Sequence, residues 1–240
     1  MKSALLIARR EAYTYLRSPL GAAVIAAVLL GEGLYFYWSG LTERRVSAEV
    51  LQEFFNVASG GILLATPVLC MRLVAEERQV GTMTLLNTAP LRDRDIVLGK
   101  FISAFAMIAL LTALSFYMPA LIFVNGKVSL GHIAVGYLGV LLLGAAVTAI
   151  GLFASSLARS QVLAVILTAA FLVPLLLLWM VARAVDPPLN EVLAAMALHH
   201  DNYRPFMMGT LKLGSVAYYL AVTFFFLLSA TKVLEARRWH

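Results

Sequence analysis

The charged residues of the chain are concentrated in one stretch, EERQVGTMTLLNTAPLRDRDIVLGK, at positions 76–100. Eight of the 32 Asp, Glu, Lys and Arg residues lie there, between two long apolar segments. Gly99-Lys100 is the pair that closes a phosphate-binding loop, but Phe101 follows it and no glycine lies five positions before Gly99. No such loop occurs elsewhere in the sequence. We therefore expect that this chain is not an enzyme and does not hydrolyse ATP.

Other residues that could do chemistry are few. His199, His200 and Asp201 are metal-ligand types, but adjacent histidines point in different directions on a helix and no Cys/His cluster supports them. We therefore expect no metal site. No Ser/His/Asp set or carboxylate pair suggests a catalytic residue. Cys70 is the single cysteine, which excludes an internal disulfide.

Glu32 is a carboxylate within an apolar segment, where a charge is costly. Two interpretations remain open. In the first, Glu32 lines a transport pathway or a helix interface. In the second, it lies near the outer headgroups, beside an aromatic belt at 35–38.

The composition requires that lipid surround much of the chain. Of its 240 residues, 61% are hydrophobic and 13% are charged, against roughly 25% charged in an average soluble domain. The sequence pI near 9.6 fits basic residues that set membrane topology and meet anionic headgroups, and we expect no nucleic-acid partner.

Six segments are apolar and long enough to cross a bilayer as helices, which takes about 20 residues. Because they show no alternating pattern, we predict an all-α membrane protein with one six-span domain over residues 1–240. Residues 1–18 predict an amphipathic interfacial helix; a disordered basic leader is the alternative. The predicted apolar face of this helix consists of Leu5, Leu6, Ala8, Ala12, Tyr13 and Leu16. Residues 183–212 form an external segment, with a short helix over 190–198. The predicted spans are 19–38, 54–71, 101–124, 132–158, 161–182 and 213–231.

The distribution of Lys and Arg predicts the orientation. With six spans, thirteen of these residues lie on the side of the termini and six on the other side. The positive-inside rule then places both termini and the 76–98 segment in the cytoplasm.

The 76–98 segment is predicted to contain two helices. One runs over 76–88 until Pro90 stops it, and Asp93 caps a second that enters the third span. On the first helix, Val80 is expected to face inward and Arg78 to face water. Pro67, Pro119 and Pro174 are expected to kink the second, third and fifth spans.

The order of residues in this segment resembles the coupling segment of ABC-2-type exporter permeases, closest to the gliding-motility type. The matching positions are Glu76, Glu77, Arg78, Gly81, Thr82, Leu85, Leu86, Pro90, Gly99 and Lys100. Thr84 and Arg92 depart from the family's common residues. The resemblance implies that this segment docks into a separate ATPase subunit.

The resemblance also implies the partners. Two ATPase copies, which bind the ATP and Mg, would lie beneath a homodimer of this chain or a heterodimer with a related permease. The complex would lie in the bacterial inner membrane, contact lipid, and export a substrate or transmit force to a periplasmic or membrane accessory protein. Two alternatives are a secondary transporter driven by an ion gradient and a non-transporting membrane scaffold.

Overall fold

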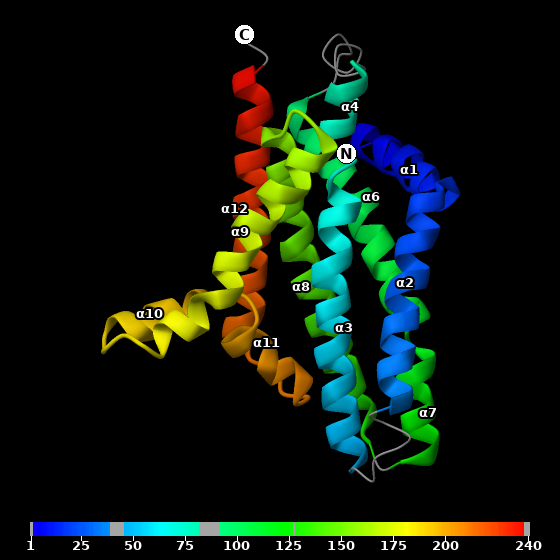
Figure 1. Cartoon of the computed structure of the whole chain (residues 1–240), viewed down its shortest axis with the longest axis vertical. Helices are drawn as coiled ribbons and strands as arrows, with labels where there is room; N and C mark the ends of the chain where they lie inside the picture. The colour runs from blue at the N-terminus through cyan, green and yellow to red at the C-terminus, as the bar shows by residue number, and fades with distance from the viewer. Residues whose placement is uncertain (1, 39–45, 82–91, 127, 238–240) are drawn as a thin grey trace.

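The protein is an all-helical bundle, seen here in a computed structural model that describes residues 2–38, 46–81, 92–126 and 128–237 (Figure 1). Within these residues no β-strand occurs. The helices are α1 (Lys2–Arg17), α2 (Pro19–Phe36), α3 (Ser47–Cys70), α4 (Ala75–Val80), α6 (Asp93–Leu114), α7 (Tyr117–Asn125), α8 (Leu130–Leu157), α9 (Gln161–Ala182), α10 (Leu189–Met196), α11 (His200–Met207) and α12 (Leu213–Arg237).

Six helical segments of the described chain are long and apolar enough to cross a membrane, which confirms the predicted fold class. Helix α3 begins at Ser47, seven residues before the predicted start of the second span. Helix α6 begins at Asp93, so the third span and the helix that leads into it are continuous. The N-cap residue of α6 is Arg92 rather than Asp93.

The third spanning segment is interrupted between α6 and α7, close to Pro119. Helix α6 ends at Leu114, and Ser115 and Phe116 form a turn before α7 begins. Proline has no N–H to donate to the carbonyl four residues earlier, which here belongs to Ser115. The expected kink is therefore a break between two helices.

The two ends of the bundle carry different elements (Figure 1). We call the end with α1, α4 and the last turn of α12 the terminal end. The other, opposite end carries α7, α10 and α11. Helix α1 lies across the bundle at the terminal end, and α10 projects sideways from it at the opposite end.

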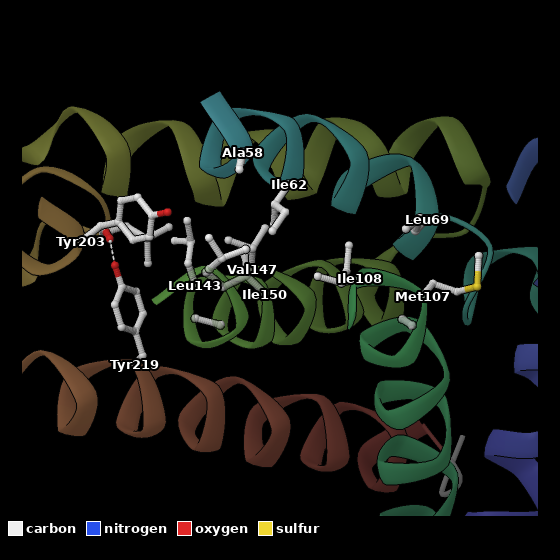
Figure 2. Close-up of a cluster of buried hydrophobic side chains, with 14 of the residues drawn as sticks. Ala58, Ile62, Leu69, Met107, Ile108, Leu143, Val147, Ile150, Tyr203 and Tyr219 are labelled. Atoms are coloured by element: carbon white, nitrogen blue, oxygen red, sulfur yellow. Dashed lines mark hydrogen bonds between the residues drawn. The ribbon is translucent and has the colours of Figure 1, made fainter. Parts of the chain in front are cut away.

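Helix α8 lies at the centre of the bundle and packs against α3, α6, α9 and α12. Its Leu143, Val147 and Ile150 are fully buried, and they meet Ile62 of α3 and Ile108 of α6 (Figure 2). Small residues let the helices approach closely. A Cβ built on Gly139 would lie 2.4 Å from the Cβ of Phe206, so α11 can pack there only against glycine.

At the opposite end, α11 is attached to the bundle by buried polar contacts. His199, before α11, lies with its Nε2 2.7 Å from the Ser59 hydroxyl of α3. Burial, with a smaller contribution from His200, lowers the pKa of His199 to about 4, so the imidazole is neutral at neutral pH. Tyr203 donates to the carbonyl of Phe55 at 2.9 Å, and Tyr219 of α12 donates to the carbonyl of Leu198 at 2.8 Å. The sequence predicted only α10 in this segment, and α11 was missed.

The close packing at Gly139 can be tested with a single methyl group. We expect Gly139→Ala to destabilise the purified protein by about 1–3 kcal/mol, the usual effect of overpacking a core. Thermal unfolding in detergent, followed by tryptophan fluorescence, measures the change. Gly214→Ala is the control, because a Cβ there meets no atom within 4 Å. Equal melting temperatures for the two variants would contradict this account of the α8–α11 contact.

Candidate functional site

Helix α4 is shorter than the sequence predicted. It begins at Ala75 and ends at Val80, because Gly81 adopts a left-handed conformation with φ of 79°. Glycine accepts this conformation without steric cost and commonly ends helices. A continuous helix over 76–88 is therefore wrong: the sequence analysis took Pro90 as the first stop signal and overlooked Gly81. Of the predicted coupling residues, Thr82, Leu85, Leu86 and Pro90 lie outside the described residues.

Lys100 of α6 is the centre of the polar contacts at the terminal end. Its side chain is 1% exposed. The ammonium nitrogen lies 2.9 Å from a carboxylate oxygen of Glu77 and 3.5 Å from one of Glu11, and it donates to the carbonyl of Leu73. A buried lysine is tolerated only when such partners replace water. One cation thus binds α1, α4 and the turn between α3 and α4.

The residue before Lys100 brings α1 against α6. A Cβ on Gly99 would lie 2.8 Å from the carbonyl oxygen of Ala4 and equally close to Ile7, so the two backbones touch here. At the other end of α1, Tyr15 donates to the carbonyl of Leu69 at 2.9 Å. Helix α1 is therefore packed into the protein, and the Gly99-Lys100 pair forms its seat.

The faces of α1 agree only in part with the predicted ones, since Ala8 of the predicted apolar face is buried. The residues that pack inward are Ala4, Ala8 and Tyr15. Leu5, Leu6 and Leu16, which the sequence placed on the apolar face, are more than half exposed. Exposed leucines beside arginines suit a helix at a lipid surface. Helix α1 thus has one apolar face toward α6 and a second one outward.

Helix α4 is also fixed to the ends of α8 and α9. The hydroxyl of Ser155 in α8 accepts hydrogen bonds from the backbone N–H of Val74 at 3.1 Å and of Ala75 at 3.2 Å. The guanidinium of Arg78 donates to the carbonyl of Ala158 at 3.0 Å, where α8 leaves unpaired carbonyls at its C-terminus. Arg78 thus faces a partner helix, contrary to the prediction that it faces water.

Val80 also differs from its predicted position. Its side chain is 68% exposed at the last residue of α4, although the sequence predicted that it packs inward. Beside it, a cleft of about 220 Å³ separates α1 from α4. Arg10 and Thr14 line the α1 side of this cleft, and Arg72 and Glu76 line the other. Arg72 Nε lies 2.7 Å from the Glu76 carboxylate.

The predicted site residues are thus distributed over two places. Glu76, Glu77, Arg78 and Gly81 gather at the terminal end, around α4. Glu32 lies outside their cleft and lines a separate groove between α2 and α3. Sequence reasoning assigned no polar contact to Glu11, Ser155 or the side chain of Lys100, although it interpreted Ser155 as one of the small packing residues of the fourth span. The one available signal was a single lysine at the start of a charge-free span.

The terminal-end site is built to hold helices together. Within the described residues, no group of three His, Cys, Asp or Glu side chains could hold a metal ion. His199 and His200 have other contacts: the first meets Ser59, and the second stacks on Trp179 with ring centroids 4.5 Å apart. The arrangement can transmit a displacement of α4 to α1, α6 and α8.

A bundle of six apolar helices with a charged, internally bonded terminal end defines a multi-span helical membrane protein. The family model described as "ABC-2 family transporter protein" matches residues 5–218. The chain belongs to this family, which is the family that the charged stretch resembled. No curated protein matches the chain.

The buried Lys100–Glu77 pair has an exposed counterpart, which provides a matched control. We expect Lys100→Met to destabilise the protein by about 3–5 kcal/mol, because it leaves carboxylates buried without their cation. Adding Glu77→Gln to that variant should restore part of the loss. Lys232→Met should cost about 0–1 kcal/mol, since Lys232 meets Glu235 at 2.6 Å on the surface with 71% of its side chain exposed. Denaturant unfolding in detergent measures all three; similar losses at Lys100 and Lys232 would refute the role of Lys100.

Proposed function

We propose that this chain is the permease subunit of an ABC transporter and that a separate ATPase subunit docks at the terminal end. The family to which the chain belongs implies such a partner in general. The observation that carries the proposal for this chain is the attachment of α4. Its end is exposed at Val80, while Glu77 connects it to α6, and Arg78 and Ala75 connect it to the C-terminal end of α8.

The docking surface consists of Val80 and the cleft between α1 and α4. An exposed apolar side chain beside paired charges offers a partner both hydrophobic contact and charged groups. Glu76, Glu77, Arg78 and Gly81 shape this surface. Thr82, Leu85, Leu86 and Pro90, which lie outside the described residues, are proposed as further contacts to the ATPase because they match the family's coupling segment. Glu77 and Arg78 serve mainly as internal connections that hold α4 in place.

The coupling follows from the two states of the complex. ATP binding can shift the permease toward one state only if the ATPases bind the two states with different affinity. Movement of α4 changes the affinity of the permease for the ATPases, because α4 moves together with α6 and α8, to which Lys100 and Ser155 connect it. Two ATPase copies and a second permease, identical or related, complete the complex, and ATP and Mg are bound by the ATPases.

The location follows from the charges. Thirteen of the nineteen basic residues on the side of the termini support a terminal end that faces the cytoplasm. A bacterial inner membrane is the location that the resemblance to exporter permeases implies. The exposed leucines of α1 then lie in the lipid headgroup region. The order of residues in the 76–100 stretch supports the gliding-motility subclass, in which the complex exports a substrate or acts on a periplasmic or membrane accessory protein.

Two valines of equal exposure test the docking surface. Val80→Glu should abolish association with the ATPase and its ATP hydrolysis, because it places a charge in an apolar contact. Val46→Glu should leave both unchanged, since Val46 is 67% exposed at the opposite end, before α3. The measurement is phosphate release by the complex purified through a tag on this chain, with the ATP-binding subunit identified by mass spectrometry.

The outcomes separate two claims. A wild-type complex without an ATP-binding subunit and without ATP hydrolysis would contradict the proposed function. If the wild-type complex hydrolyses ATP and the Val80→Glu complex hydrolyses it as fast, only the assignment of the docking surface would be contradicted. Melting temperatures of both variants confirm that each remains folded.

A further inference from the structure

A groove of about 550 Å³ runs between α2 and α3, which lie side by side in the bundle (Figure 1). Its volume is within the roughly 300–1,000 Å³ typical of sites for small molecules. Aliphatic side chains and glycines form nearly all of its wall. Its polar side chains are those of Glu32 and Tyr35, both from α2.

Glu32 is the exceptional residue of the groove. It is 3% exposed, and neither carboxylate oxygen has a hydrogen-bond partner within the described part of the chain. A carboxylate in such a position is costly unless a cation or a hydrogen-bond donor meets it. Helix geometry places it about 20 Å along α2 from Pro19 and about 6 Å before the last residue, Phe36. Within the described residues, Glu32 is thus a buried acceptor without a protein partner.

The glycines of the groove have two different roles. Gly61 makes room for Glu32, because a Cβ there would lie 2.8 Å from Val28 and 3.2 Å from a carboxylate oxygen of Glu32. Gly31 and Gly60 instead face open space, with no atom within 4 Å of an added Cβ. The groove is thus wide beside the carboxylate, and side chains could be added at Gly31 or Gly60 without displacing protein atoms.

We propose that this groove binds a hydrophobic organic cation, a molecule with one positive charge on an apolar body. Its apolar part would lie along Val24, Val28 and Leu64, and its positive charge would meet the Glu32 carboxylate. Charge complementarity selects this occupant. A lipid acyl chain could fill the apolar part of the groove but offers nothing to the carboxylate. The proposal that such a cation is also the transported substrate rests on the permease function proposed above. The proposal that the groove binds the cation does not depend on that function.

Tetraphenylphosphonium is the probe, because its charge is permanent and its body is apolar. Binding is measured by titration of the full chain in nanodiscs of zwitterionic lipid, with empty nanodiscs as the blank. We expect saturable binding to the wild type. Glu32→Gln should weaken it roughly tenfold or more, the loss expected when a buried charge partner is removed. Neutral triphenylphosphine oxide should bind wild type and Glu32→Gln alike.

Three further variants complete the test. Gly60→Leu fills the groove from its open side and should abolish binding while Glu32 is retained. Glu49 lies on α3, the helix that also carries Gly60, and its side chain is exposed. Glu49→Gln should change the affinity for the cation by less than about twofold, because exposed charges are screened by salt. Arg44→Ala/Arg45→Ala removes two cations that lie outside the described residues and should leave binding unchanged.

Several results would overturn the proposal. They are binding no greater than to empty nanodiscs, equal affinity in Glu32→Gln, and binding that appears only after Arg44 and Arg45 are removed. Conversion of a dimer to a monomer by Glu32→Gln, without cation binding in the wild type, would assign the carboxylate to a contact between copies instead. None of these measurements involves ATP hydrolysis, so their failure is distinct from failure of the ATPase coupling.

Discussion

The structure depends on the burial of one lysine. An ammonium group removed from water must recover the lost hydration through carboxylates and carbonyls held in fixed positions. Lys100 does so with Glu11 of α1, Glu77 of α4 and the carbonyl of Leu73 in the turn before α4. The same requirement that makes Lys100 costly also fixes α1, α4 and the end of α3 relative to α6. Movement of any one of these elements alone would remove one of the partners of the buried ammonium group.

Helix α8 carries this arrangement to the opposite end of the bundle. It is 28 residues long, about 42 Å at the rise of an α-helix. Ser155 near its last turn accepts from the first residues of α4, and His132 near its first turn lies 2.7 Å from the carbonyl of Met207 at the end of α11. Gly139 admits Phe206 of α11 on the same helix. Because α8 is buried and continuous, a shift of α4 bears on α11 through packed contacts, with no loop in between.

The sequence predicted the fold well where the signal is local and the site poorly where the partner is distant. Apolar segments of about 20 residues predicted six spans. A segment surrounded by lipid must satisfy its backbone hydrogen bonds internally, and an α-helix does this within the segment itself. The inward direction of Arg78 could not be predicted, since its acceptor, the carbonyl of Ala158, lies 80 residues away along the chain. Glu11 and Lys100 are similarly distant in sequence, whereas the role of Gly81 was readable from its residue type alone and was missed.

The groove and the terminal-end site are joined by the same helix, which gives the proposed cation site a means of control. Helix α3 contributes Gly60 and Gly61 to the groove and continues to Cys70, just before the turn whose Leu73 carbonyl binds Lys100. On the other wall, α2 follows α1 through Ser18, whose hydroxyl accepts from the N–H of Gly21 at 3.1 Å. Helices α2 and α3, which form the two walls of the groove, therefore both adjoin elements that contact Lys100. A change at α4 that alters the contacts of Lys100 would therefore bear on the ends of α2 and α3, the two helices that form the groove around Glu32.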